Sequence, residues 1–149
     1  MRNFLILTLI AASSFVANAN DSVVQSKSTV KDAITQIEEA YNTCAGDAQS
    51  TADSNNCSSI AYTNADKELN RVYNLIRTPL VKDTDVENKE ILRRLVTAQK
   101  AWITFRDADC ELAGTAMLNG SGEGVIIGGC LVAKTIERVK HLQGFLGEQ

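Results

Sequence analysis

The sequence predicts an all-α protein, an antiparallel bundle of three to four helices joined by two disulfides. Apolar residues recur three or four positions apart over most of the chain, and no stretch alternates convincingly as a strand. There is a single proline, and five of the nine glycines fall between 120 and 129, which leaves the remainder nearly free of helix breakers. A chain of 149 residues is long enough for one core but too short for two.

The first nineteen residues have the order of a secretory signal peptide. Arg2 precedes an apolar run from Phe4 to Val16, and the small residues around Ala19 follow it. That run is shorter than the roughly 20 apolar residues that a membrane-spanning helix needs. We therefore expect a signal peptide over 1–19, cleaved after Ala19, no membrane span, and a periplasmic or secreted protein.

Export determines how the four cysteines are interpreted. Outside the reducing cytosol, an even number of cysteines is typical of disulfides. Three pairings are possible. The local one, Cys44–Cys57 with Cys110–Cys130, is favoured because each pair brackets a turn between two helical segments. Each such bridge would contribute ~3 kcal/mol to the free energy of unfolding.

The N-terminal part is expected to divide at the first cysteine. Residues 20–43 form an extension, polar at first and then helical from about 30 to 43, where apolar residues follow helical spacing. Residues 44–146 form the main helical domain. It begins with a loop over 45–56, a segment rich in Ser, Asp, Asn and Gly.

Three further helices are expected in the main domain. The first of them runs from about 58 to 77 and is ended by Pro79. The next, from about 87 to 117, has the most regular apolar stripe in the chain. A glycine-rich break over 119–129 follows, and the last helix, starting at 125 or 130, continues to 146. The break is interpreted either as a plain connector or as a surface for binding another protein.

Composition argues against most catalytic and nucleic-acid functions. The lone histidine, His141, excludes a multi-histidine metal site and weakens any scheme that needs a histidine base. Asp107 and Glu111 share one side of a helix and could act as a catalytic pair on cell-wall glycan. We interpret them instead as part of a solvated acidic face, and the enzyme is the least favoured of the functions considered. A net charge of −3 argues against nucleic acid. We expect no catalytic residue, no metal and no cofactor.

Polar residues on the sides of the helices that face the bundle predict a hydrogen-bonded network. Asp66 and Asn70 lie one turn apart, as do Trp102 and Arg106, and Arg138 lies on the last helix. Groups of this kind are tolerated in a core only when they are paired. We interpret them first as residues that set the register of the helices, and second as a patch that binds a partner.

Three strings of the chain resemble the lysozyme inhibitor LprI-like family, small secreted or lipid-anchored bacterial envelope proteins with a cysteine-bearing helical domain. The strings are ADKELNRVY (65–73), AQKAWITFRDADCELA (98–113) and CLVAKTIERVKHL (130–142). The early cysteines fit as well, so the resemblance runs from Cys44 to Leu142. With the positions that match the family pattern, the expected network comprises Asp66, Asn70, Tyr73, Gln99, Trp102, Arg106, Asp107, Thr135 and Arg138.

The resemblance implies an exported, non-enzymatic binding protein that inhibits lysozyme or a related peptidoglycan hydrolase. An acidic inhibitor would be steered toward a basic lysozyme. The expected contacts are Asn119, Ser121 and Glu123 on the glycine-rich turn. Because a catalytic carboxylate would repel a glutamate, a basic residue such as Lys134 or Arg138 is the other candidate. The alternative function is a periplasmic interaction, immunity or structural factor without lysozyme inhibition.

Overall fold

The described part of the protein is entirely built from helices and turns. The computed structural model describes the backbone of residues 19–146 and the side-chain surroundings of residues 29–146, so most of the expected signal peptide, residues 1–18, lies outside it. Within 19–146 there is no strand, and the all-α prediction is confirmed. The elements are α1 (Ala19–Asp47), α2 (Thr51–Lys82), α3 (Val86–Gly114), the 3₁₀ turn η1 (Thr115–Met117) and α4 (Glu123–Gly144).

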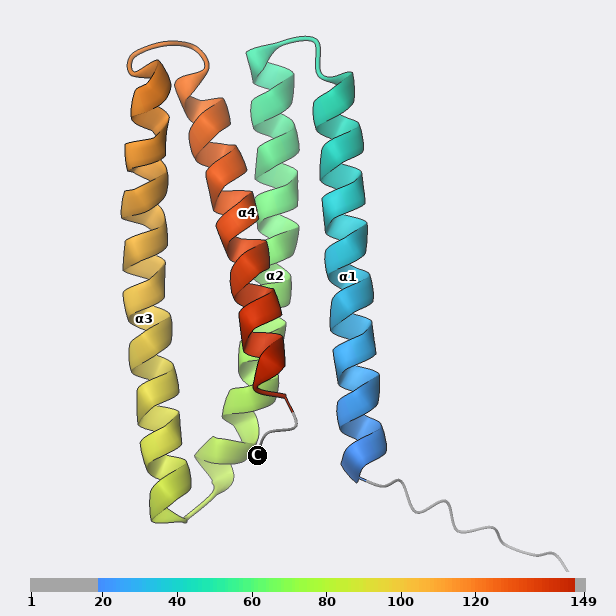
Figure 1. The fold of residues 1–149 in the computed structure, drawn as a ribbon, viewed down its shortest axis with the longest axis vertical. Helices are drawn as coiled ribbons and strands as arrows, with labels where there is room; N and C mark the ends of the chain where they lie inside the picture. The colour runs from blue at the N-terminus through green and yellow to red at the C-terminus, as the bar shows by residue number, and fades with distance from the viewer. Residues whose placement is uncertain (1–18, 147–149) are drawn as a thin grey trace, which may run out of the picture.

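The four helices lie side by side with alternating direction (Figure 1). α4 packs most extensively against α2, while α1 lies against α2 and α3 lies mainly against α4. The connections α1–α2 and α3–α4 are at one end of the bundle, and the α2–α3 connection is at the other. The central pair α2–α4 therefore carries the core, with α1 and α3 on its flanks.

The core is an aliphatic stripe shared by α1, α2 and α4. Its α1 members, Val30 and Ile34, are almost completely buried, so the segment before the first cysteine belongs to the bundle. α3 contributes its larger side chains only at the margin, where Ile91, Leu95 and Trp102 are partly buried. The buried stripe of the other helices consists of Ala61, Ala65, Leu69, Val72, Ile76, Leu80, Val132, Ile136, Val139 and Leu142.

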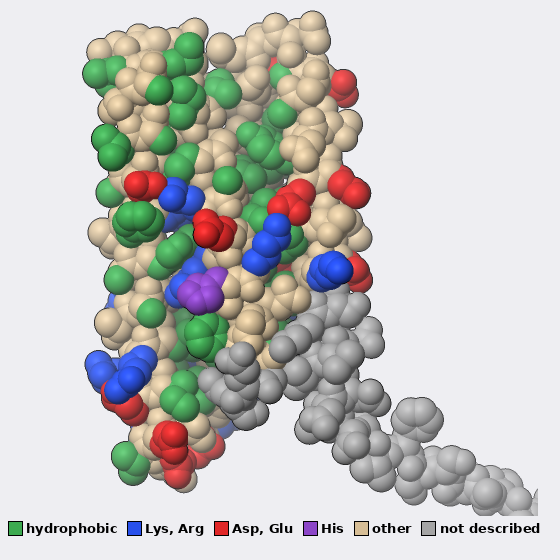
Figure 2. Space-filling model, viewed as in Figure 1, with side chains coloured by type: hydrophobic (Ala, Val, Ile, Leu, Met, Phe, Trp, Pro, Cys, Tyr) green, Lys and Arg blue, Asp and Glu red, His purple; other side chains and the backbone are tan. Residues whose placement is uncertain are grey.

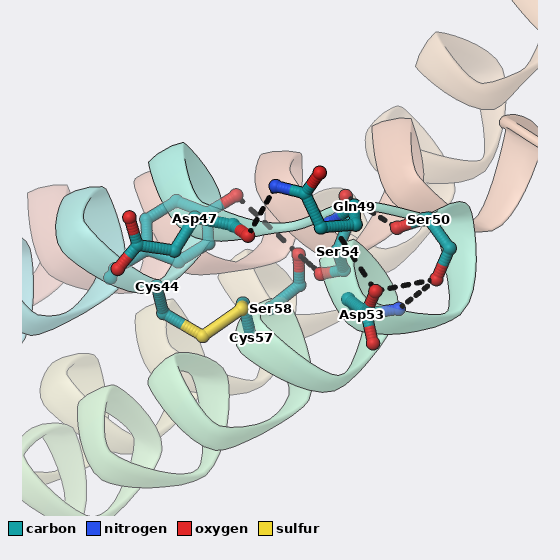
Figure 3. The surroundings of a disulfide bond; sticks show 9 residues. Cys44, Asp47, Gln49, Ser50, Asp53, Ser54, Cys57 and Ser58 are labelled. Carbon is teal, nitrogen blue, oxygen red and sulfur yellow. Dashed lines mark hydrogen bonds between the residues drawn. A yellow bond between two sulfur atoms is a disulfide. The ribbon is translucent and has the colours of Figure 1, made fainter.

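The predicted loop over 45–56 is wrong. α1 continues to Asp47 and α2 already begins at Thr51. The polar residues there act as a helix cap, because the Ser50 side chain accepts the Asp53 N–H at 3.1 Å and the Asp53 carboxylate accepts from the Ser50 hydroxyl at 2.7 Å (Figure 3). Serine and aspartate at this spacing are typical of a helix start as well as of a loop.

Pro79 does not end its helix, contrary to the prediction. α2 continues through it to Lys82 and bends in its last turns (Figure 1). A proline removes one backbone hydrogen bond and kinks a helix, but buried neighbours can hold the turn that follows. Leu80, only 3% exposed, is such a neighbour.

The glycine-rich break is shorter than predicted. α3 ends at Gly114, before the expected 117, and α4 begins at Glu123, so Gly124, Gly128 and Gly129 are helical. They allow close packing of helices: a Cβ on Gly128 would lie 2.8 Å from the Ser58 Cβ of α2. Burial against α2 thus outweighs the low helix propensity of glycine.

Candidate functional site

Both disulfides lie toward the same end of the bundle. Cys44–Cys57 joins α1 to α2 (Figure 3), and Cys110–Cys130 joins α3 to α4. The predicted local pairing is therefore the one observed. We call the two connections at this end, residues 48–50 and 115–122, together with the adjoining helix turns, the disulfide-closed end. The crosslinks hold these two connections on a rigid base.

The longer connection is closed by its own hydrogen bonds. Asn119 has a positive φ of 62°, a conformation that asparagine tolerates better than most residues. Its backbone N–H donates to the Glu123 carboxylate at 2.8 Å, and the Gly120 N–H donates to the Met117 carbonyl at 2.8 Å. Ser121, which follows Gly120 in this connection, is exposed. Asn119, Ser121 and Glu123 thus lie together in an ordered turn.

Lys134, the fourth expected partner contact, lies further down α4. Its ammonium group is 2.7 Å from the Asp109 carboxylate and stacks over the Phe105 ring, 5.2 Å from the centroid. The side chain is 26% exposed. It is therefore engaged within the α3–α4 pair and does not join the turn residues.

Large apolar side chains are exposed at the disulfide-closed end. Leu112, Met117 and Leu118 have exposed fractions of 67%, 52% and 61%. Leu112 lies in the last turn of α3, Met117 ends η1 and Leu118 follows it. Single exposed apolar residues are ordinary, whereas several close together in the chain are candidates for an interface. Figure 2 shows green apolar side chains and few charged ones on the upper part of the face in view.

The charges of the chain are segregated along the bundle. Residues 32–66 and 107–133 form the half that carries both disulfides, and they contain no Lys or Arg, but six and four acidic residues respectively. Four carboxylates at the disulfide-closed end form no ion pair with any described residue: those of Asp47, Asp53, Glu111 and Glu123. The Lys and Arg residues of the described helices lie outside these two segments. The disulfide-closed end is therefore acidic, and the rest of the bundle carries the basic groups.

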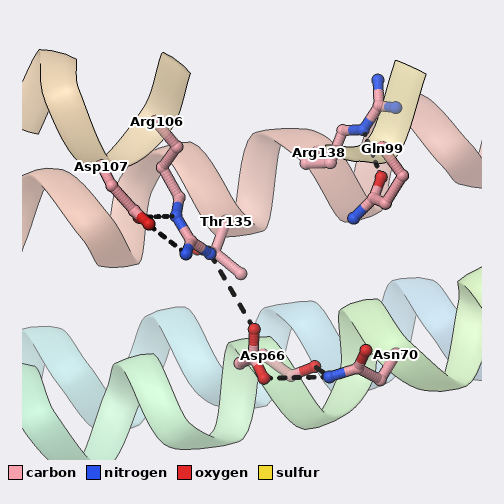
Figure 4. A network of polar contacts seen from close by, with 7 residues as sticks. All are labelled: Asp66, Asn70, Gln99, Arg106, Asp107, Thr135 and Arg138. Carbon is pink, nitrogen blue, oxygen red and sulfur yellow. Dashed lines mark hydrogen bonds and ion pairs between the residues drawn. The ribbon is translucent and has the colours of Figure 1, made fainter. Parts of the chain in front are cut away.

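The expected polar network is centred on Arg106, which is 5% exposed (Figure 4). Its guanidinium contacts the Asp107 carboxylate at 2.8 Å and lies 3.9 Å from the Asp66 carboxylate of α2. It also donates to the Thr135 hydroxyl of α4 at 3.4 Å. Asp66 in turn accepts from the Asn70 amide at 2.9 Å. One arginine on α3 thus links α2 and α4.

A second buried arginine lies two turns lower on α4 than the disulfide Cys130. Arg138 Nε donates to the Gln99 amide oxygen at 3.0 Å (Figure 4), and Nη1 donates to His141 Nδ1 at 3.1 Å. Both arginines also lie near the Trp102 ring, with Arg106 at 5.0 Å and Arg138 at 5.6 Å from its centroid. Burial lowers the pKa of the Arg138 guanidinium from its ordinary value.

Tyr73 and the pair Asp107 and Glu111 do not have the arrangement that their predicted roles require. Tyr73 packs, partly buried, against the apolar core and is not among the polar contacts described above. The carboxylates considered for catalysis do not form a site either, since Asp107 is bound to Arg106 and Glu111 is exposed on the outside of α3. Within residues 29–146 no cluster of His, Cys, Asp or Glu side chains is arranged to hold a metal ion.

Sequence reasoning missed the acidic character of the disulfide-closed end and its exposed apolar residues. The absence of Lys and Arg from 32–66 and 107–133 is readable in the sequence, but only the helix pairing shows that the two segments meet. No helix in the described part is long and apolar enough to cross a membrane.

The fold and this site define a class of protein, a disulfide-joined helical bundle with an acidic, rigid end. The sequence model of the family described as "Lysozyme inhibitor LprI" matches residues 42–142, and the chain belongs to this family. A protein of Rhizobium meliloti (strain 1021), itself described as uncharacterized, is 37% identical over 102 residues, which are 64% of this chain and 73% of that protein. No solved structure matches the chain significantly.

Proposed function

We propose that the protein is exported and inhibits a basic lysozyme or a related peptidoglycan hydrolase without being an enzyme itself. In this proposal the signal peptide is removed after Ala19, and the disulfide-closed end is the docking surface. Family membership supports the protein class, and two disulfides are typical of an exported chain.

The charge segregation is the observation that carries the proposal. This end has four carboxylates that form no ion pair with a described residue, and its two segments contain no Lys or Arg. It therefore attracts a positively charged surface and repels an acidic one. Complementary charge increases the rate of encounter and orients the partners before contact. The acidic end would therefore meet a basic hydrolase first.

Contact at this end would be made by apolar and polar groups on a rigid turn. Leu112, Met117 and Leu118 are each more than half exposed, so most of their surface is available for contact. The disulfides and the bond from Asn119 to Glu123 hold the turn before binding, so little conformational freedom is lost in the complex. We assign the central contacts to Leu118, Asn119 and Ser121.

The contacts of the two basic candidates, Lys134 and Arg138, favour the turn residues over a basic residue as the central contact. Lys134 is bound to Asp109, and Arg138 is buried, so neither presents a free cation to a carboxylate in a partner's cleft. One oxygen of Glu123 is occupied by the Asn119 N–H. Its charge therefore lies at the base of the turn, and the uncharged residues 118–121 lead the approach.

The experiment is the clearing of a cell-wall suspension by purified lysozymes of several types, with and without the oxidised protein. We expect slower clearing with at least one basic lysozyme. Leu118→Ser should weaken this inhibition at least about tenfold, as loss of a central interface residue does. The matched control is Val86→Ser, which changes an 81% exposed side chain at the opposite end and should leave inhibition unchanged.

Undiminished clearing by every lysozyme at large molar excess would contradict the proposal. The periplasmic interaction, immunity or structural role would then be favoured. Equal inhibition by the two serine variants would leave a lysozyme inhibitor but would reject the disulfide-closed end as its docking surface.

A further inference from the structure

A row of exposed apolar residues runs along α3, the helix at the edge of the bundle (Figure 1). Its members recur three and four positions apart in alternation, which is the spacing of a coiled-coil seam. The two large members, Phe105 and Leu112, are 57% and 67% exposed, and the three alanines are exposed as well. We call this row the α3 seam; it consists of Ala98, Ala101, Phe105, Ala108 and Leu112.

The sizes of the seam residues fit an antiparallel copy of the same helix. In that arrangement Phe105 faces Ala108 of the second copy, and Leu112 faces its Ala101, because the layers of an antiparallel pair join the two alternating seam positions. Two-fold symmetry makes each of these contacts occur twice. A large side chain opposite a small one fills the space between the helices, whereas a parallel pair in register would place Phe105 against Phe105.

The charge of α3 changes sign along the helix. Residues 86–100 contain four basic and two acidic residues, a net charge of +2, and residues 101–114 contain one basic and three acidic residues, a net charge of −2. An antiparallel pair places the positive half of one helix against the negative half of the other. A parallel pair would place like charges together, so complementary charge selects the antiparallel orientation.

Two exposed charges beside the seam are available for such a pair. Lys100 and Glu111 are eleven positions apart, about three helical turns, and therefore lie along the same edge of the seam. Both are exposed, and neither forms an ion pair with a described residue. When Phe105 faces Ala108 of a second copy, Lys100 of each copy comes beside Glu111 of the other.

We propose that α3 binds α3 of a second copy of this chain, antiparallel, and that the α3 seam is the contact of a weak two-fold dimer. Five seam residues on each copy are fewer than the roughly 20–30 of a standard interface, so the dimer dissociates in the micromolar range or above. The dimer does not depend on lysozyme inhibition. Leu112 belongs both to the seam and to the disulfide-closed end, so self-association and hydrolase binding would compete for it.

The test is sedimentation velocity of the oxidised protein from about 10 μM to about 1 mM. We expect the monomer to give way to a dimer within this range. Phe105→Ser should raise the dissociation constant at least about tenfold. The matched control is Ile60→Ser, which changes a 54% exposed isoleucine of α2 and should leave association unchanged. Circular dichroism shows whether both variants are folded.

Two outcomes of this experiment would overturn the proposal. A monomer at every concentration would mean that no second copy covers the seam, and would leave it to a partner of another kind. Equal dissociation constants for the two serine variants would mean that the protein associates through another surface.

Charge exchange tests the orientation. Lys100→Glu and Glu111→Lys should each raise the dissociation constant at least about threefold, because each places like charges side by side in both symmetry-related contacts. The double variant restores opposite charges and should recover the dissociation constant of the parent. In a parallel pair these two residues do not meet, so failure of the double variant to recover association would overturn the antiparallel arrangement.

Discussion

The guanidinium of Arg106 on α3 lies 3.4 Å from the hydroxyl of Thr135 on α4. Thr135 is completely buried, and Arg106 is 5% exposed, so a polar contact joins two helices inside an otherwise aliphatic interface. A contact of this kind is satisfied at only one register of α3 on α4. It lies about one helical turn from the Cys110–Cys130 bridge, and the two features together fix how these helices pair.

Removing the arginine should destabilise the bundle. Arg106→Met loses the hydrogen bonds to Asp107 and Thr135, and we expect the free energy of unfolding to fall by about 2–4 kcal/mol. Arg77→Met changes an exposed arginine of α2 and should stay within about 0.5 kcal/mol of the parent. Urea unfolding followed by circular dichroism measures both, and equal stability of the two variants would contradict the role of Arg106.

Each disulfide should stabilise the fold separately. Replacing Cys44 and Cys57 together by Ala, or Cys110 and Cys130 together, should lower the free energy of unfolding by about 3 kcal/mol for each pair, since the loops closed are of similar length. Urea titration gives the values. Non-reducing peptide mapping should yield the two local crosslinks, and crossed pairs or free thiols in the oxidised protein would contradict the structure.

Two glycines should respond to alanine in opposite directions. Gly128→Ala places a methyl group 2.8 Å from the Ser58 Cβ and should destabilise the protein by about 1–3 kcal/mol despite its better helix propensity. Gly46→Ala meets no atom within 4 Å and should stabilise α1 by up to about 1 kcal/mol. Thermal unfolding distinguishes them, and stabilisation by both would show that α4 does not approach α2 so closely.

Glu90 should titrate far below an ordinary glutamate. Hydrogen bonds from Arg93 and then Arg94 lower its pKa from 4.5 to about 2. Because the folded pKa is the lower one, the stabilisation by this ionised carboxylate is present above pH 4.5 and is lost as the pH falls toward 2. The difference in Tm between the parent and Glu90→Gln should therefore shrink over that range. A carboxyl NMR titration that places Glu90 near 4.5 would refute this.

The helices themselves were predictable, whereas their ends were not. Apolar spacing identifies the buried stripes of α2 and α4 because burial there follows the helical period. The residues at which the helices begin and end are not determined by local composition alone. Ser50 begins a helix where a loop was expected, and Leu80 is buried beyond Pro79. Gly128 is helical because Ser58 packs against it, a contact that no local rule shows.

Most residues of the polar network were predictable from the sequence, but the way in which they are grouped was not. The turn residues and the arginine network are visible as polar groups at helical spacing. The sequence does not reveal that Arg106 is paired with carboxylates while Arg138 is not, because both follow the same pattern of an arginine on a core-facing side. That difference arises from the packing of α2 against α3, which brings the Asp66 carboxylate within 3.9 Å of Arg106.

Charge reversal at the disulfide-closed end tests the central claim most directly. The pair Asp47→Lys with Glu111→Lys alters two exposed carboxylates at this end, and the pair Asp32→Lys with Glu39→Lys makes the same change in net charge on the outside of α1. The measurement is the inhibition constant toward a basic lysozyme for each double variant. We predict at least about a tenfold loss for the first pair and little change for the second, because only the first places like charges against the enzyme. Equal inhibition constants for the two would contradict docking through this end.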